Sequence, residues 1–457
     1  MRRGDQLRDI GRQYRQSVIL AAAVGAVTGL GVVLYDEIVV ELMLEAVYDA
    51  PLWVAAFMPL VGLLVAAVLI QWVGGQSTET TDAYIRNYHD PTRDLDQRPL
   101  LGRLAASIAT IGSGGAMGLE GPSVYIGAGI GSEIQKRFAR IFSFDHPKVL
   151  MVAGAAAGVA AIFKTPATGA IFALEVPYQG DLARRMLLPA LVAAASGYLV
   201  FVGFEGTGRL LPVLGAPAFD LRDVGGAIVL GVGAGLLARV FAMLMREAKA
   251  LAQRTHPYVR ALGGGIALAA IFAACRFLTG DSLTLGPGFN AVEWAIEDSS
   301  RGVAIVLGVF ALRTIATSAT VAGGGAGGLF VPLVVAGALF GRAVGGIVGA
   351  VDTTLFTVIG VAAFLGAGYR VPLAAVMFVA ESTGRAGFVV PGVIAAVAAE
   401  LVMGRSSVTK YQVWAANEPV EPEHASPPDT EGASDDPDDV DADEPDDTDG
   451  SGSDRDT

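Results

Sequence analysis

One acidic residue, Glu120, stands in a stretch otherwise made of glycine, proline and apolar residues, GGAMGLEGP at 114–122. A carboxylate at membrane depth is costly and is by default a functional candidate. Its oxygens carry the charge of a halide ion, so a carboxylate and an anion can compete for the same donors. Protonation of Glu120 would weaken its hold on those donors and admit the anion. The residue and its setting therefore predict a gate, with a helix-capping acid as the structural alternative.

The residues around Glu120 are typical of a helix that begins with free backbone N–H groups. Pro122 suits a first helical turn, because the N–H groups of that turn lack intrahelical partners. These groups and the positive helix end attract an anion, and Gly118 and Gly121 let the backbone approach it closely. The site needs no lysine or arginine, and the lack of a full countercharge lets the ion leave quickly.

The same pattern occurs a second time, which indicates an internal duplication. Residues 324–332 read GGAGGLFVP and share Gly-Gly-Ala-x-Gly-Leu-x-x-Pro with 114–122. A second pair follows in the same order, FKTPATGAIFALE at 163–175 and YRVPLAAVMFVAE at 369–381. We therefore expect two repeat halves, at about 15–203 and 222–405, and inverted repeats are a common plan among transporters.

The elements that position these motifs are predicted to be membrane helices. Hydrophobic residues make up 53% of the 457 residues and charged ones 17%, whereas soluble domains carry about a quarter charged residues. Some apolar segments reach the roughly 20 residues that span a bilayer. Others are short and are paired across Gly or Pro breaks, at 104–117 with 123–132, 149–163 with 167–177, and 355–367 with 371–381. Such broken helices survive only inside protein or beside an aqueous cavity, so they point to a transport site.

The two ends of the chain differ in charge. Basic residues gather in residues 1–15, and the positive-inside bias predicts a cytoplasmic N-terminus. From Glu418 onward there are 17 acidic residues and one basic residue, Arg455, with almost no apolar residues, so we expect disorder. The expected domains are a cytoplasmic basic segment at 1–15, a transmembrane domain at 16–410 and an acidic disordered tail at 411–457, with both termini cytoplasmic.

These motifs resemble those of one family. GLEGPSVYIGAGIG (118–131) resembles the signature of the CLC family of chloride channels and chloride/proton exchangers, and GGLFVPLVVAGALFG (327–341) resembles its second pore signature. The motifs at 163–175 and 369–381 resemble two further family segments. The resemblance covers about 15–410 and implies an all-α integral membrane protein with the CLC fold. That fold has two inverted repeats of tilted and broken helices, about eighteen per subunit. The resemblance also implies a homodimer with one pore per subunit, of the prokaryotic type without C-terminal regulatory domains.

Carried over residue by residue, the resemblance assigns roles within the two pore motifs. Glu120 matches the gating glutamate. The residues expected to bind the anion are Gly118, Leu119, Gly121 and Pro122 in the first motif, and Leu329, Phe330 and Val331 in the second.

Two departures concern the remaining anion ligands. The family's first anion motif usually reads Gly-Ser-Gly-x-Pro-Glu, but here the serine position falls on Gly75, with Gln76 or Ser77 as substitutes. The late pore tyrosine of the family falls on Thr409, and Tyr411 takes its place if the register shifts by two.

A third departure concerns the proton. Proton-coupled members often carry two successive glutamates, but here Glu175 is followed by Val176. The inner proton acceptor is then missing, and Glu175 is expected to hold structure more than to relay protons. We therefore expect chloride transport through a glutamate-gated pore, leaning to passive, channel-like conduction. A chloride/proton antiporter with another inner proton path is the alternative, and a fluoride-selective variant is third.

Other classes of function fit less well. An intramembrane enzyme would need a nucleophile–base pair or an HExxH motif, and the sequence has neither. The four histidines are far apart and lack metal-site spacing. We therefore expect no catalytic residue, metal or cofactor. The expected partners are a small anion, membrane lipid and a second copy of the chain, without nucleic acid.

Overall fold

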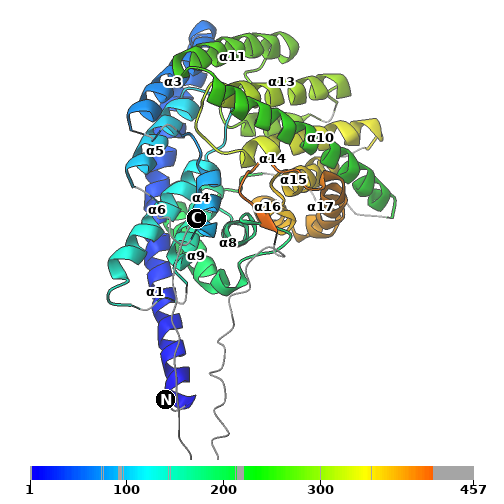
Figure 1. The fold of residues 1–457 in the computed structure, drawn as a ribbon. Coiled ribbons are helices and arrows are strands. Elements are labelled where there is room, and N and C mark those ends of the chain that lie inside the picture. Colours follow the sequence, from blue (N-terminus) through cyan, green and yellow to red (C-terminus); the bar gives the residue numbers. More distant parts are fainter. Residues whose placement is uncertain are drawn as a thin grey trace, which may run out of the picture. The chain divides into compact units, whose positions relative to one another are not determined.

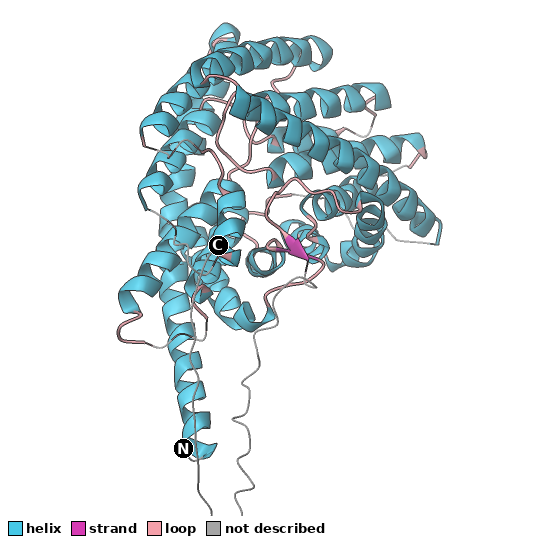
Figure 2. Cartoon of the chain, in the orientation of Figure 1, coloured by secondary structure: helices cyan, strands magenta, loops and turns pink. Residues whose placement is uncertain are grey.

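The computed structural model describes residues 3–73, 75, 77–90, 95, 97–142, 144, 146–211, 213, 221–298, 300–350 and 353–414. The described chain is built almost entirely of helices (Figure 1), and Figure 2 shows how little strand accompanies them. The helices are α1 (Arg3–Asp36), α2 (Glu45–Tyr48), α3 (Leu52–Trp72), α4 (Thr81–His89), α5 (Gln97–Gly112), α6 (Glu120–Phe138), α7 (Val149–Phe163), α8 (Pro166–Glu175), α9 (Leu187–Glu205), α10 (Leu221–Arg254), α11 (Pro257–Thr279), α12 (Phe289–Glu297), α13 (Val303–Ala322), α14 (Phe330–Ile347), α15 (Thr354–Tyr369), α16 (Pro372–Thr383) and α17 (Val389–Met403).

Short elements link these helices. A π-helical segment (Glu37–Leu44) continues α1 into α2, and single 3-10 turns (Arg184–Met186 and Ala386–Phe388) precede α9 and α17. Strands β1 (Tyr178–Gln179) and β2 (Val413–Trp414) pair in parallel, so the segment after α17 returns to lie beside the end of α8.

The molecule is a multi-pass membrane protein. Within the described residues, eight helices are long and apolar enough to cross a bilayer: Arg15–Tyr48, Leu52–Trp72, Arg184–Glu205, Asp223–Arg254, Pro257–Thr279, Val303–Ala322, Phe330–Ile347 and Ala386–Met403. Several of them expose large apolar side chains, among them Leu401 and Phe277, which suits a lipid surface rather than water.

The predicted helix breaks are present. Helix α5 ends at Gly112 before α6 begins at Glu120, α7 ends at Phe163 before α8, and α15 ends at Tyr369 before α16. Every residue of α7 is buried, as expected of a short helix that lies inside protein at membrane depth.

The second and third breaks have the same local cause. Lys164 and Arg370 each adopt a left-handed conformation, with φ of 55° and 60°, and so end the helices before them. Left-handed backbone is unfavourable for residues other than glycine. Pro166 and Pro372 then begin the next helices, as prolines in a first turn do. This shared conformation at matched positions reflects the predicted duplication.

The two halves are inverted repeats that meet where α8 packs beside α16. Glu175, at the end of α8, accepts hydrogen bonds from the backbone N–H groups of Leu373 and Ala374 in the first turn of α16, at 3.1 and 2.8 Å. Glu381, near the end of α16, accepts hydrogen bonds from the N–H groups of Ala167 and Thr168 in the first turn of α8, at 2.9 and 2.7 Å. Each half thus caps the broken helix of the other.

The N-terminal end of the chain forms part of a helix. The basic N-terminal residues from Arg3 onward belong to α1, which continues without interruption into the first candidate span. The acidic tail predicted from residue 411 lies, from 415 onward, outside the described residues.

Candidate anion site

The starts of α6 and α14 lie next to each other. Gly118 and Gly328, which occupy matched positions in the two halves, donate N–H hydrogen bonds to each other's carbonyl oxygens at 2.9 and 2.8 Å. A Cβ on Gly328 would lie 1.8 Å from Oε1 of Glu120, and a Cβ on Gly118 would lie 1.9 Å from Oε2. Only glycine leaves room for the carboxylate here.

The carboxylate of Glu120 occupies the N-terminus of the opposite helix. Glu120 is fully buried, and its Oε1 accepts a hydrogen bond from the backbone N–H of Phe330 at 2.5 Å. Its Oε2 is buried and has no hydrogen-bond partner among the described residues. The first turn of α14 is therefore an anion-binding helix start, and a carboxylate of the chain itself fills it.

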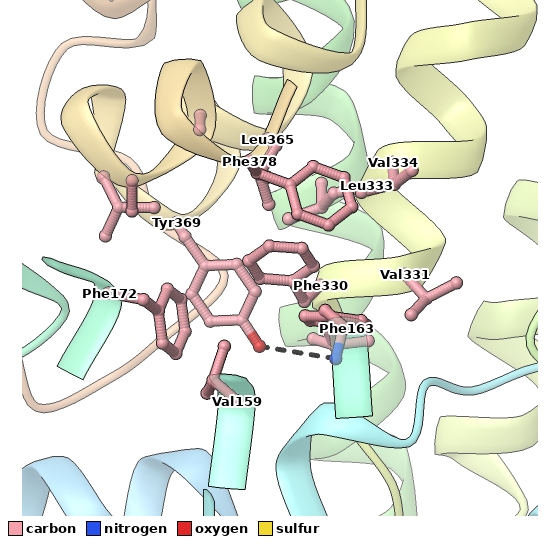
Figure 3. Packing of buried hydrophobic residues seen from close by; sticks show 14 of the residues in the cluster. Val159, Phe163, Phe172, Phe330, Val331, Leu333, Val334, Leu365, Tyr369 and Phe378 are labelled. Carbon is pink, nitrogen blue, oxygen red and sulfur yellow. Dashed lines mark hydrogen bonds between the residues drawn. The ribbon is translucent and has the colours of Figure 1, made fainter. Parts of the chain in front are cut away.

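Aromatic rings enclose the helix start on the side of Phe330 (Figure 3). The Phe330 ring stacks on Phe163 with ring centroids 4.7 Å apart, and meets Phe172 and Phe378 edge-on at 5.4 and 5.0 Å. The three rings around Phe330 come from both members of the second repeated motif: Phe163 and Phe172 from 163–175, and Phe378 from 369–381. That motif thus supplies an apolar wall that shields the donors from water.

A hydroxyl that the sequence analysis missed reaches the site from Tyr369. Its oxygen accepts a hydrogen bond from the backbone N–H of Leu329 at 3.3 Å (Figure 3), and the side chain is 2% exposed. The first residue of the repeated motif is Phe163 in one half and Tyr369 in the other. This added hydroxyl is the signal that could have identified it.

The segment just before α4, which holds the predicted first anion motif, contributes Thr80, a residue that the sequence analysis did not predict. Its Oγ1 donates a hydrogen bond to the carbonyl of Gly327 at 3.2 Å and would lie 2.5 Å from a Cβ on Gly121. Of the three predicted residues, Ser77 lines the cavity described below, Gly75 lies near Pro99 at a positive φ of 66°, and residue 76 lies outside the described residues.

The remaining predicted residues take different places. Leu119, Pro122 and Val331 are buried at the two helix starts beside Gly118, Gly121 and Gly328. Thr409 lines the cavity, where its hydroxyl lies 2.9 Å from that of Ser407. Tyr411 does not line the cavity and instead lies under the guanidinium of Arg86, 5.4 Å from the ring centroid.

The pair predicted for the proton side is buried. Both oxygens of Glu175 are occupied by the N–H groups of α16, which is the arrangement that a structural role requires. Val176 is fully buried, and its carbonyl accepts a hydrogen bond from Gln412 at 3.0 Å. The same Gln412 nitrogen lies 2.7 Å from the carbonyl of Tyr369, so the segment after α17 is tied to both halves.

A cavity of about 180 Å³ reaches the donors from one side. It is lined near the site by Thr80, Gly328, Leu329 and Tyr369, and farther out by charged side chains of α4, α10, α11 and the segment after α17. We call this cavity the vestibule. Within the described residues, no group of three or more His, Cys, Asp or Glu side chains could hold a metal ion.

The family model described as voltage gated chloride channel matches residues 61–404, which include both helix starts, Glu120 and Tyr369. The chain belongs to this family. Its CLC fold is that of solved structures. A slow cyanobacterial Cl⁻/H⁺ antiporter superposes with a TM-score of 0.76 at 20% identity, covering 85% of this chain and 94% of that one. A CLC-type fluoride/proton antiporter superposes with a TM-score of 0.74 at 21% identity, covering 88% and 98%.

Relatives by sequence bear two kinds of name. The H(+)/Cl(-) exchange transporter ClcA of Citrobacter koseri is 26% identical over 434 residues, which cover 88% of this CLC chain and 89% of the relative. A ClcB-like protein of Ralstonia nicotianae, which carries a provisional chloride-channel name, is 28% identical over 364 residues, covering 76% and 82%.

Proposed function

We propose that this protein exchanges chloride, or a similar small anion, for protons across a membrane, with Glu120 as the shared gate. The observation that carries the proposal is the hydrogen bond from the Phe330 N–H to the buried Glu120 carboxylate. The Phe330 N–H, which suits a dehydrated anion, is bonded to the Glu120 carboxylate, and protonation of the carboxylate can free this N–H.

The exchanger has more support than the passive channel that the sequence favoured. Val176 argued for a channel, because the second glutamate of many proton-coupled members is absent there. Of the two relatives described above, ClcA of Citrobacter koseri, covered over 89% of its length, is named as an exchange transporter, and the ClcB-like protein, covered over 82%, carries a provisional channel name. A ClcA of Salmonella paratyphi B, also 26% identical, is likewise named as an exchange transporter. The proposal therefore takes the antiporter and leaves passive conduction as the competing result of the experiment below.

The mechanism follows from the shared donors. With Glu120 ionised, the first turn of α14 is occupied and the anion is excluded. Protonation removes the charge that holds the carboxylate there, and the side chain leaves the N–H of Phe330 to the anion. Phe330 and Val331 then present backbone N–H groups, whereas the N–H of Leu329 is bonded to the hydroxyl of Tyr369. The glycines at 118, 121 and 328 permit close approach.

The Tyr369 hydroxyl accepts the Leu329 N–H and keeps its own hydrogen for the anion, the role that the sequence assigned to Thr409 or Tyr411. The Thr80 hydroxyl donates to the carbonyl of Gly327, so it fixes the turn beside the site and does not take the role assigned to residues 75–77.

The test is chloride efflux from liposomes with simultaneous proton recording, for wild type and Glu120→Ala. In the wild type, chloride efflux should drive protons into the liposomes. The chloride flux should rise as the pH falls, because protonation opens the gate. Glu120→Ala should conduct chloride without proton movement and without most of the pH dependence. Full pH dependence in Glu120→Ala would disprove the gate, and wild-type efflux without protons would favour the channel.

The anion could also be fluoride, because the residues at 75–77 depart from the usual first motif. Competition between fluoride and chloride in the same efflux assay decides between them.

We further propose a homodimer with one pore per subunit, and cytoplasmic termini on the side of the basic residues of α1. The proposed domains remain 1–15, 16–410 and 411–457.

A further inference from the structure

Two buried threonines stand at matched positions before the turns that lead into α6 and α14. Thr110 in α5 and Thr320 in α13 each precede the first glycine of a pore motif by four residues, and neither is exposed. Each hydroxyl donates a hydrogen bond within its own helix, from Thr110 to the carbonyl of Ala106 at 2.8 Å and from Thr320 to that of Ala316 at 2.9 Å. Each hydroxyl oxygen is therefore still able to accept a bond from elsewhere.

Each of these oxygens accepts a hydrogen bond from the opposite half of the molecule. The backbone N–H of Ala116, in the turn before α6, donates to Thr320 at 3.1 Å. The backbone N–H of Ala326, in the turn before α14, donates to Thr110 at 3.2 Å. Neither N–H bonds to a backbone carbonyl of the described chain, so a threonine of the other half satisfies each of these two buried donors.

The same threonines also hold the turns of their own halves. The carbonyl of Thr110 accepts the N–H of Gly115 at 2.8 Å, and the carbonyl of Thr320 accepts the N–H of Gly325 at 2.9 Å. Each threonine is thus bonded to both turns, once through its carbonyl and once through its hydroxyl. With the backbone pair between the two helix starts, these bonds fix the turn that carries the gate against the turn that carries the donor.

We propose that Thr110 and Thr320 are positioning residues of the gate, which set how closely the Glu120 carboxylate approaches the first turn of α14 and thereby the pH at which the gate opens. The proposal rests on the proposed gating by Glu120. The hydroxyl of Thr320 holds the turn that carries the carboxylate, and the hydroxyl of Thr110 holds the turn that carries the donor. Loss of the first should affect the gate alone, whereas loss of the second should affect both the gate and the binding of the anion.

The first test removes each hydroxyl and keeps the shape of the side chain, in Thr110→Val and Thr320→Val. A donor that is displaced from the carboxylate stabilises its ionised form less, so protonation takes place at a higher pH. We expect the midpoint of chloride flux against pH to rise by about half a pH unit in each variant, a roughly three-fold change in the protonation equilibrium. Thr317→Val is the matched control, at a buried threonine of α13 whose hydroxyl donates to the carbonyl of Arg313 at 3.1 Å within the same helix, and it should keep the wild-type midpoint.

The second test separates the two threonines in a Glu120→Ala background, where no carboxylate competes for the donor. There Thr110→Val should still raise the KM for chloride about three-fold, because the anion binds to the same loosened turn. Thr320→Val should leave the KM unchanged, because the turn that it loosens no longer carries a gate. A general loss of structure would alter the KM in both variants alike.

Conservative variants complete the experiment. Thr110→Ser and Thr320→Ser keep the hydroxyl and should restore the wild-type midpoint. If a valine variant does not fold, the cysteine variant takes its place, because a thiol is a weaker acceptor of similar size. Unchanged midpoints in the variants without a hydroxyl, or equal effects on the KM in the Glu120→Ala background, overturn the positioning role and leave the proposed exchange intact. Full pH dependence in Glu120→Ala by itself overturns the gate.

Discussion

Glu175 and Glu381 offer a test that separates structure from proton transfer. Changing either residue to Gln replaces a carboxylate with two acceptor oxygens by an amide with one. At α16, the N–H groups of Leu373 and Ala374 each bond to one oxygen of Glu175, so Glu175→Gln leaves one of them facing an NH₂ group. The same holds at α8, where the hydroxyl of Thr168 also donates to Glu381, at 2.6 Å.

The size of the effect follows from these contacts. A buried N–H without a partner costs about 1–3 kcal/mol. Loss of the negative charge at a helix N-terminus adds about 0.3–1 kcal/mol, and up to about 2 kcal/mol where the geometry is partly buried. Each substitution should therefore destabilise the protein by roughly 1–5 kcal/mol. The two changes should not add in the double variant, because both loosen the same pair of helices.

The assay is thermal unfolding in detergent, together with the chloride and proton fluxes of the folded variant. Glu133→Gln, at an exposed position in α6, is the control. We expect Glu175→Gln to lower the unfolding temperature while the number of protons moved per anion stays at the wild-type value. If Glu175→Gln kept its stability and lost proton movement, Glu175 would be a proton relay, and our interpretation of its hydrogen bonds would be wrong.

Two other substitutions test the anion site itself. Tyr369→Phe keeps the ring and removes the hydroxyl whose hydrogen is proposed to bind the anion, so chloride affinity measured by calorimetry should fall about three- to ten-fold, the effect of one hydrogen bond. An affinity that stays unchanged or rises, because the Leu329 N–H becomes free, would remove the Tyr369 hydroxyl from the anion's ligands. Gly328→Ala places a Cβ 1.8 Å from Oε1 of Glu120 and should displace the carboxylate, so its flux should lose pH dependence, whereas Gly203→Ala, at a position with open space, should behave as wild type.

The helix breaks and the duplication were predictable because their causes are local. Pro166 and Pro372 can begin helices but cannot continue them, and the motifs before them match between the halves. Glu120 stood out as a candidate in the sequence, since a lone acid among glycines in a membrane segment is rare, and its role stays a prediction.

The hydroxyls at the site were not predictable in the same way. Tyr369 lies at the end of α15, about forty residues before Thr409, and comes to Leu329 only through the packing of α15 on α14. Thr80 follows the predicted residues 75–77 closely, but the turn before α4 decides which of these side chains faces Gly327. Sequence spacing specifies neither packing nor turn geometry, so Ser77 and Thr409 line the vestibule without a hydrogen bond to the donors of the described chain, and Tyr411 lies elsewhere, beside Arg86.

The proposed gate gives a route to proton coupling without an acid at position 176. In the proposed mechanism, Glu120 and the anion need the same Phe330 N–H, so they exclude each other. An ionised carboxylate that leaves this donor must give up its charge-assisted hydrogen bond, whereas a protonated one gives up less. Each anion that enters therefore tends to bring one proton onto Glu120. Coupling then depends on how seldom the carboxylate leaves while ionised. On this view, an exchanger and a channel differ in two properties: how strongly the first turn of α14 binds the ionised carboxylate, and how well the aromatic rings around Phe330 exclude water. Val176 does not decide between them.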